Sequence, residues 1–327
     1  MHRLGRRTFL TAAASLLAVP FAACTQQPPA LPRIGFLSPT VRGPRDIAFL
    51  QGLRELGYVE GRTATVVLRF ADGRPERLAP LVDELIRAGV DVLVVGSTIG
   101  ARAARNATTT LPIVFAGSSD PIAGGIVSNL ARPAGNVTGV SLAYGDGAAG
   151  QWLAWLKEVT PRMAHGAALW SSSNAAAAAF VSELGAAARS AGVRLDAHHA
   201  SQPVELDMVL AAIAASGAQG LVVTPSPFAA SQQDRLVRFA AEHRLPAMYF
   251  SEDFVDAGGL MSYGPSIVEA YRRAAAYVDR ILKGAKPGDL PVEQPTRFDL
   301  VVNATTAKQL DLVLPQPILL RANRLVG

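Results

Sequence analysis

Cysteine is nearly absent from this chain, and so are long apolar runs. Cys24 is the only cysteine among 327 residues, so no disulfide can form within the chain and its stability must come from packing. After the first 24 residues, no segment reaches the roughly 18 consecutive apolar residues that a membrane-spanning helix needs. About 300 residues remain beyond that point, which is enough for two domains of ordinary size.

An excess of charge of one sign is missing as well. The formal net charge is +5, from 31 basic and 26 acidic side chains. Three of the basic residues lie within the first seven positions, and without them the net charge falls to +2. No basic stripe with interleaved aromatic residues remains, so the sequence argues against a nucleic-acid-binding protein.

The motifs of several enzyme classes are also absent. None of the five histidines stands at a zinc-like spacing from another ligand, and His198-His199 is expected at a strand end or on the surface. The segment Gly259–Gly264 has one residue too many before Ser262 to be a nucleophile elbow. The glycine-rich signatures of nucleotide-binding loops do not occur. The sequence therefore predicts no catalytic residue, no metal site and no cofactor.

The first 23 residues are predicted to be a signal peptide. Two arginines precede a Phe-Leu pair in Leu4–Leu10, which is the pattern of a twin-arginine export signal, although Gly5 replaces the usual Ser or Thr. The apolar stretch Thr11–Ala23 is too short to span a bilayer. It ends at Ala-Ala-Cys24, which predicts cleavage before Cys24 and attachment of lipid to its sulfur. Phe21 departs from the usual Leu, so cleavage to a soluble periplasmic form is the alternative. Residues 24–32 are expected to form a flexible stalk.

Short apolar runs alternate with segments of helical period in the rest of the chain. Apolar positions at Leu78, Leu81, Val82, Leu85 and Ile86 follow one helical face, and helices are also expected from Phe49 to Leu56 and from Ile267 to Leu282. Short, nearly unbroken apolar runs of this kind are typical of strands buried on both faces of a parallel sheet. The runs are Ile34–Leu37, Val66–Leu68, Val90–Val95, Ile113–Phe115, Ala167–Trp170, Leu221–Val223, Met248–Phe250 and Leu260–Tyr263.

This alternation predicts an α/β fold with two doubly wound lobes joined by a hinge. The N-terminal lobe is expected to comprise residues 33–141 plus a returning tail, 259–327. The C-terminal lobe is expected to comprise residues 142–258. A loop rich in Gly, Pro and Asn is expected at 131–139. Trp152 and Trp155 lie three apart on one helix and are expected in the core or at the lobe interface.

Polar residues follow nearly every predicted strand. Ligands of open α/β sheets bind beyond the carboxyl ends of the strands, where the N-terminus of the next helix also favours an anion. The alternative for each hydroxyl is that it only caps the following helix. The candidate ligand-binding residues at strand ends are Ser38, Pro39, Ser97, Thr98, Ser118, Ser119 and Asp120 in the first half, and Ser172, Asn174, Pro225, Ser226, Glu252 and Asp253 in the second.

The mixture of charges at these strand ends favours an amino acid or a related small organic acid as the ligand. Hydroxyls and helix N-termini can bind a carboxylate, whereas Asp120, Glu252 and Asp253 can balance an ammonium group. Tyr144, Phe228 and Phe254 lie on nearby loops and are candidates for an apolar slot. The alternative is that Asp120 caps a loop and that the other two carboxylates are solvated.

Several longer segments carry a resemblance to a known family. They are Pro112–Pro121, Asn129–Gly139, Ala257–Pro265, Tyr271–Ala275, Lys283–Pro287, Leu290–Pro295, Phe298–Asn303 and Leu319–Ala322. These segments resemble the bacterial ABC-transporter substrate-binding family that includes tryptophan- and phenylalanine-binding members, and the resemblance covers essentially the whole mature chain. It implies a type I periplasmic-binding fold, with the listed strand-end loops lining the two walls of a cleft. Ser119 stands where many relatives have a glycine.

The resemblance also implies a function and a set of partners. The protein would capture a small solute between its lobes, outside the cytoplasm, and deliver it unchanged to a membrane permease that is served by a separate ATPase subunit. It would act as a monomer held at the membrane by lipid on Cys24. A sensory module that presents the same closed clamp to a receptor is an alternative, and an exported enzyme is a further one.

Overall fold

The computed structural model describes residues 30–145, 147–171 and 175–327. The predicted signal peptide, Cys24, most of the predicted stalk, Ser172 and Asn174 lie outside the described residues. Among the residues that are described, no helix is both long and apolar enough to cross a membrane.

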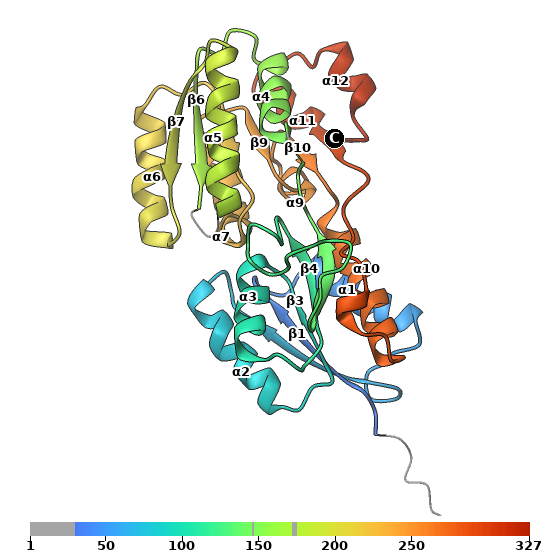
Figure 1. The fold of residues 1–327 in the computed structure, drawn as a ribbon. Coiled ribbons are helices and arrows are strands. Elements are labelled where there is room, and N and C mark those ends of the chain that lie inside the picture. The colour runs from blue at the N-terminus through green and yellow to red at the C-terminus, as the bar shows by residue number, and fades with distance from the viewer. Residues whose placement is uncertain (1–29, 146, 172–174) are drawn as a thin grey trace, which may run out of the picture. The chain divides into compact units, whose positions relative to one another are not determined.

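The first half of the chain forms a parallel five-stranded sheet with the order β2-β1-β3-β4-β5 (Figure 1). Neighbouring residues of its strands point to opposite faces, and both faces are apolar. Phe36 and Val94 belong to one buried cluster, whereas Leu37 and Val95 belong to another. The sheet is therefore covered on both sides. Its strands are β1 (Arg33–Ser38), β2 (Thr65–Phe70), β3 (Val92–Val95), β4 (Ile113–Ser118) and β5 (Val137–Ser141).

Two pairs of helices cover the two faces of this sheet. Helices α2 (Leu78–Arg87) and α3 (Thr98–Ala107) pack on the face of Leu37, because Leu81, Leu85 and Ala101 join the same cluster. Helix α1 (Pro44–Glu55) packs along α10 (Ile267–Leu282) on the other face. A short 3-10 helix, η1 (Pro75–Arg77), precedes α2. All three helices that the sequence predicted are confirmed within a few residues.

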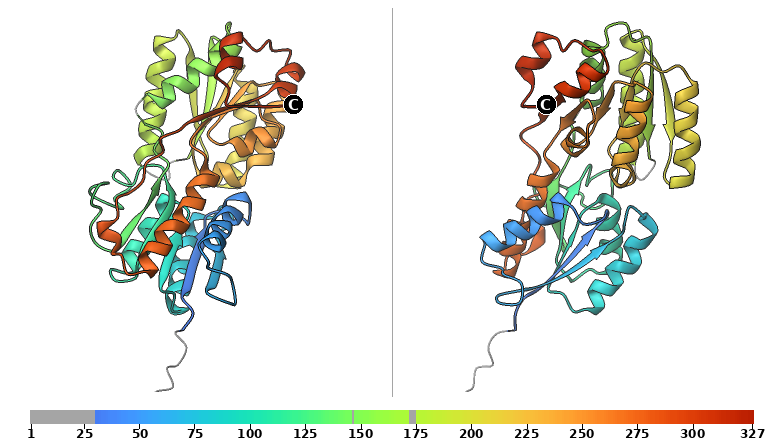
Figure 2. Two further views of the ribbon diagram at one scale, coloured as in Figure 1. Left: turned by 90° about the vertical axis from the view of Figure 1, so that its right-hand side faces the viewer. Right: turned by 180° about the vertical axis from the view of Figure 1, so that it is seen from behind.

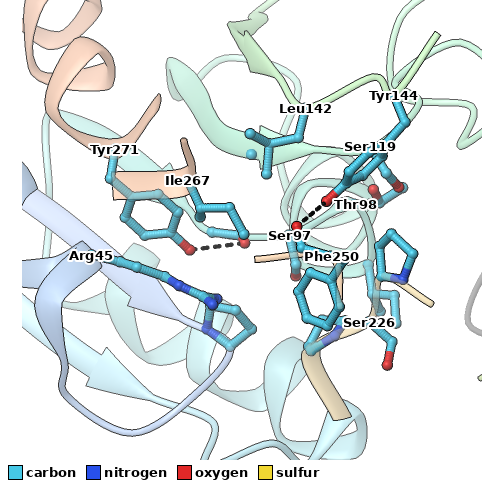
Figure 3. A pocket seen from close by; sticks show the side chains of 16 residues that line it. Arg45, Ser97, Thr98, Ser119, Leu142, Tyr144, Ser226, Phe250, Ile267 and Tyr271 are labelled. Atoms are coloured by element: carbon cyan, nitrogen blue, oxygen red, sulfur yellow. Dashed lines mark hydrogen bonds between the residues drawn. The ribbon is translucent and has the colours of Figure 1, made fainter. Parts of the chain in front are cut away.

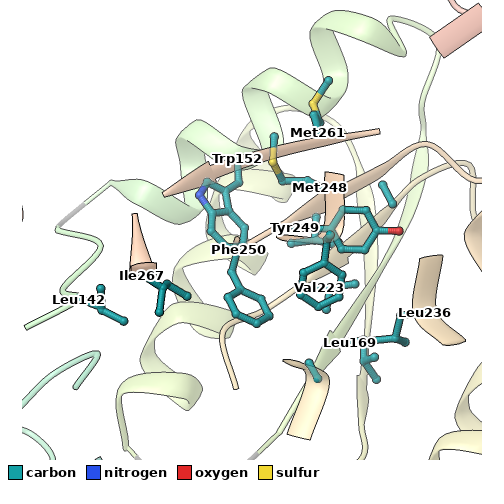
Figure 4. Close-up of a cluster of buried hydrophobic side chains, with 14 of the residues drawn as sticks. Leu142, Trp152, Leu169, Val223, Leu236, Met248, Tyr249, Phe250, Met261 and Ile267 are labelled. Carbon is teal, nitrogen blue, oxygen red and sulfur yellow. The ribbon is translucent and has the colours of Figure 1, made fainter. Parts of the chain in front are cut away.

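The second sheet has seven strands in the order β12-β11-β10-β9-β8-β6-β7. All its pairs are parallel except β10 with β11. Met248 and Met261 of this sheet and Trp152 of a covering helix are buried together, and Figure 4 shows them gathered between the sheet and its helices. Trp152 and Trp155 are both buried, as expected. The strands are β6 (His165–Trp170), β7 (Arg194–His199), β8 (Leu221–Val223), β9 (Ala247–Tyr249), β10 (Met261–Gly264), β11 (Asp299–Asn303) and β12 (Arg324–Val326).

The remaining helices surround the second sheet, as the two views of Figure 2 show, apart from the short η2. Helices α4 and α5 pack on each other. His198 and His199 lie at the end of β7, as the sequence predicted. The helices are α4 (Ala148–Val159), α5 (Ala175–Ser190), α6 (Pro203–Ala215), α7 (Pro227–Ser231), α8 (Gln233–Glu242), α9 (Glu252–Asp256), η2 (Pro287–Asp289), α11 (Ala304–Gln309) and α12 (Gln316–Arg321).

The tail 259–327 does not return as a whole to the first lobe, which corrects the predicted boundary. Helix α10 packs on the first sheet, but β10, β11 and β12 all belong to the second. Hydrophobic periodicity predicts the type of an element, not its partner in a sheet. The chain therefore crosses between the sheets after β5, after β10 and again after η2, where Glu293 N donates to Gly139 O at 3.0 Å.

The predicted loop at 131–139 is also corrected at its end. Strand β5 begins at Val137 and pairs with β4 as the edge strand of the first sheet. The sequence did not predict this strand because its apolar run is only a few residues long and directly follows residues rich in glycine and proline, which are typical of a loop.

Candidate functional site

A cavity lies between the two sheets, beyond the carboxyl ends of their strands (Figure 3). The empty space between its walls is about 600 Å³, counting the part that is open to solvent. Both lobes and two of the crossing segments contribute to it. It is lined by Pro39, Arg45, Gly96, Ser97, Thr98, Ile99, Gly117, Ser119, Leu142, Tyr144, Pro225, Ser226, Pro227, Phe250, Ile267 and Tyr271.

Hydroxyl groups at the N-terminus of α3 and after β4 form the polar wall on the side of the first sheet. Ser97 is the N-cap of α3 and accepts a hydrogen bond from Gly100 N at 3.1 Å. The hydroxyls of Thr98 and the buried Ser118 are 2.9 Å apart and hydrogen-bonded. The Ser119 hydroxyl makes no hydrogen bond to another described residue and lines the cavity. Ser97 therefore caps a helix and faces the cavity at the same time.

The wall on the side of the second sheet follows the same plan. Ser226 caps α7 by accepting a hydrogen bond from Ala229 N at 3.0 Å. Pro225 and Pro227 flank it in the lining, and Phe250 follows β9. The Tyr144 hydroxyl donates to the carbonyl of Phe250 at 3.2 Å, which joins a crossing segment to the second sheet.

Tyr271 brings α10 to the cavity. Its hydroxyl donates to Gly96 O at 3.0 Å, and the bond is drawn in Figure 3. A side chain at Gly96 would overlap this tyrosine, so only glycine fits there. Burial raises the pKa of both Tyr144 and Tyr271, so both phenols stay protonated and act as donors at neutral pH.

Arg45, in the first turn of α1, is the one charged side chain among the described residues that line the cavity. Its Nη2 lies 2.9 Å from Asp253 Oδ2, and the two side chains are 13% and 17% exposed. Burial alone lowers the pKa of Arg45, but Asp253 and, more weakly, the phenols of Tyr271 and Tyr144 outweigh it and leave that pKa above its ordinary value. The guanidinium is thus a permanent cation on the cavity wall.

The other acidic candidates lie elsewhere. Asp120 Oδ1 accepts hydrogen bonds from Ile122 N and Ala123 N at 3.0 and 2.9 Å, so Asp120 does cap its loop. It faces a neighbouring hollow rather than this cavity. Glu252 Oε2 lies 3.2 Å from Arg324. Asp253 lines a separate hollow beside α1 and α8.

Structure and sequence prediction overlap in part at this site. Predicted residues that do not line the cavity include Ser38 and Ser118, buried at the ends of β1 and β4, and Phe228 and Phe254, buried in the core. The sequence prediction found these lining residues: Pro39, Ser97, Thr98, Ser119, Tyr144, Pro225 and Ser226. It missed these: Arg45, Gly96, Ile99, Gly117, Leu142, Pro227, Phe250, Ile267 and Tyr271.

The missed residues share a structural origin. Arg45, Ile267 and Tyr271 come from the N-terminal parts of two helices, α1 and α10, not from the ends of strands. Tyr271 belongs to a regular apolar stripe, which predicts a core position. The available signal for Arg45 was its place in the first helical turn after the polar end of β1.

Comparison with known proteins decides the family. Residues 44–326 match the family model described as "ABC transporter substrate binding protein". The chain belongs to this family. As a substrate-binding protein of an ABC transporter with a type I periplasmic-binding fold, it places its cavity between two α/β lobes, in agreement with the sequence prediction.

Individual relatives are similar over most of the substrate-binding protein. A tyrosine-binding protein of Clostridioides difficile (strain R20291) is 23% identical over 264 residues, which cover 81% of this chain and 75% of the relative. The ABC domain from Streptococcus pneumonia in complex with L-Trp is 27% identical, with a TM-score of 0.81 over 90% of this chain and 100% of that one. A conserved domain protein from Vibrio cholerae has 27% identity and a TM-score of 0.82 over 90% and 99%.

Proposed function

We propose that this substrate-binding protein captures an amino acid or an aromatic or other organic acid in the cavity between its lobes. The observation that carries the proposal is the lining, in which Arg45, several hydroxyls and aromatic rings come from both lobes. Relatives named for binding tyrosine and for a complex with L-Trp support the same class of solute. Of the predicted site residues, Pro39, Ser97, Thr98, Ser119, Tyr144, Pro225 and Ser226 are proposed as ligand contacts.

The binding cycle is that of a clamp. A solute that contacts both walls stabilises the closed arrangement of the lobes, by no more than its differential affinity for that arrangement. The Arg45–Asp253 ion pair joins α1 of one lobe to α9 of the other, and it supports closure because its desolvated charges are matched. Closure creates a composite surface for a permease, and ATP is consumed by a separate subunit. No bond of the solute changes.

Export and anchoring complete the proposal. Residues 1–23 would direct export by the twin-arginine route, and lipid on Cys24 would tether the protein beside its permease. Tethering raises the effective concentration of the clamp at the permease without any new contact. The protein would work there as a monomer.

A thermal-shift screen of the purified protein against amino acids and aromatic acids tests the binding function. A solute present at about 100 times its dissociation constant is expected to add roughly 2.7 kcal/mol to the free energy of unfolding. Recovery of that solute unchanged after prolonged incubation separates binding from catalysis. Conversion of the solute into a product would overturn the proposal.

Metabolic labelling with palmitate tests the anchor. The full chain is expected to incorporate the label and to fractionate with membranes, whereas Cys24→Ala should do neither because the acceptor sulfur is gone. A wild-type chain that stays unlabelled in the soluble periplasmic fraction would show that the signal peptide is cleaved to give a protein without a lipid anchor.

A further inference from the structure

The residues that line the cavity carry charge of one sign only, which is positive. Arg45 is the only charged group among the described lining residues. One of its nitrogens, Nη2, is bound to Asp253, while Nε and Nη1 donate no hydrogen bond to another described residue. Figure 3 shows its side chain directed into the cavity. The wall therefore offers positively charged donors to a ligand.

None of the three carboxylates that would balance an ammonium group lines the cavity. Asp253 is paired with Arg45 and does not line the cavity, whereas Arg45 lines both the cavity and the hollow beside α8. Asp120 uses Oδ1 for two backbone N–H groups and faces the neighbouring hollow. Glu252 is paired with Arg324. An ammonium buried in the cavity would thus lack a carboxylate partner among the described lining residues, which is strongly unfavourable.

The remaining donors and surfaces suit an apolar acid. The Ser119 hydroxyl is free to donate to a carboxylate, as are the unused N–H groups of Arg45. Leu142, Phe250 and Ile267 supply apolar contact for the rest of the ligand.

We infer that the ligand is an aromatic monocarboxylic acid without an amine, held by Arg45, rather than an α-amino acid. This inference rests on the proposed function, and it narrows the class of solute that the same cavity takes. Arg45 is then the residue that determines specificity for the anion.

Matched ligand pairs test the inference by calorimetric titration of the purified protein. 3-Phenylpropionate and L-phenylalanine differ only in the amine, and phenethylamine keeps the amine but lacks the carboxylate. We expect the acid to bind at least about 10-fold more tightly than the amino acid, because the buried ammonium finds no partner, and the amine to show no binding. Indole-3-propionate against L-tryptophan repeats the comparison with a larger ring.

Variants on one helix locate the anion site. Arg45→Gln is expected to weaken binding of 3-phenylpropionate by about 10- to 100-fold, the effect of losing a charged hydrogen bond. Arg54→Gln, on the exposed face of the same helix, is the matched control and should leave the affinity unchanged. If Arg45→Gln does not fold, the affinities of the wild-type protein for the acid and for the amino acid still test whether the ligand lacks an amine.

The outcomes separate the two proposals. Tighter binding of L-phenylalanine or L-tryptophan than of its deaminated partner overturns the inference and leaves the binding function standing. Equal affinities of Arg45→Gln and the wild-type protein for the acid also overturn it. If no acid binds but another small solute does, the inference fails alone, whereas absence of binding to any solute in the wider screen counts against the binding function itself.

Discussion

Replacing Gly139 with alanine is expected to lower the free energy of unfolding by about 4 kcal/mol, which combines steric overlap with backbone strain. Gly139 lies in β5 opposite Phe115 of β4, with a φ of 153°. An added Cβ would overlap the carbonyl oxygen of Phe115 and lie 2.6 Å from its amide nitrogen. Both groups are main-chain atoms of a neighbouring strand, so neither can rotate away. Urea unfolding followed by circular dichroism measures the change.

Gly135→Ala is the matched control for this prediction. Gly135 also has a positive φ, 66°, but an added Cβ would meet no atom within 4 Å. Its replacement should lower the free energy of unfolding by only about 1 kcal/mol, which is the strain of a positive φ in a residue with a Cβ. A similar loss of stability in both variants would show that φ, and not the approach of β4, determines the need for glycine at 139.

Replacing Gly73 with alanine is expected to weaken ligand binding by about 10- to 100-fold, the equivalent of 1–3 kcal/mol of overpacking. Gly73 follows β2 in the first lobe, and an added Cβ would overlap the side chain of Ser231 at the end of α7 in the second lobe. Without ligand, the variant can avoid this overlap because its two lobes can stay apart. Closure around a ligand brings the two residues together. The cost therefore appears in the affinity for the solute, measured by titration calorimetry with the best ligand of the screen.

A second substitution tests the cause. Ser231→Gly removes the two atoms that the new Cβ would overlap and leaves only Cα at 4.0 Å, so the double variant should recover most of the affinity. Gly89→Ala is the control for backbone strain, because Gly89 has a φ of 67° and open space around it. Unrestored affinity in the double variant, or an equal loss in Gly89→Ala, would rule out contact between the lobes as the reason.

Sequence patterns predicted the elements of this fold better than their assembly. Buried parallel strands such as β3 and amphipathic helices such as α2 and α10 carry strong periodic signals. Strands β5, β11 and β12 were missed, and β7 was anticipated only at its end, His198-His199. A short edge strand, or a strand with polar positions, gives a weak periodic signal. The partner of β10 is set by chain connectivity and packing, which periodicity does not encode.

The site was half predictable for a related reason. The rule that ligands bind at strand ends located Ser97 and Ser226. Capping a helix and lining the cavity are not alternatives for these two residues, because each caps a helix and also lines the cavity. Arg45 and Tyr271 reach the cavity only because α1 and α10 pack on the same face of the first sheet. That packing joins residues over 200 positions apart, and no local pattern reports it.

The late position of α10 bears on the order of folding. All five strands of the first sheet have been synthesised by Ser141, yet the face that α1 shares with α10 lacks Tyr271, Ala274 and Val278 until residues 267–282 emerge. The nascent first lobe therefore keeps an apolar surface exposed while the entire second-lobe core from α4 to β10 is made. The first lobe can complete its core only after most of the second lobe has been synthesised. Folding of the whole molecule therefore includes a slow step that joins residues far apart in the sequence.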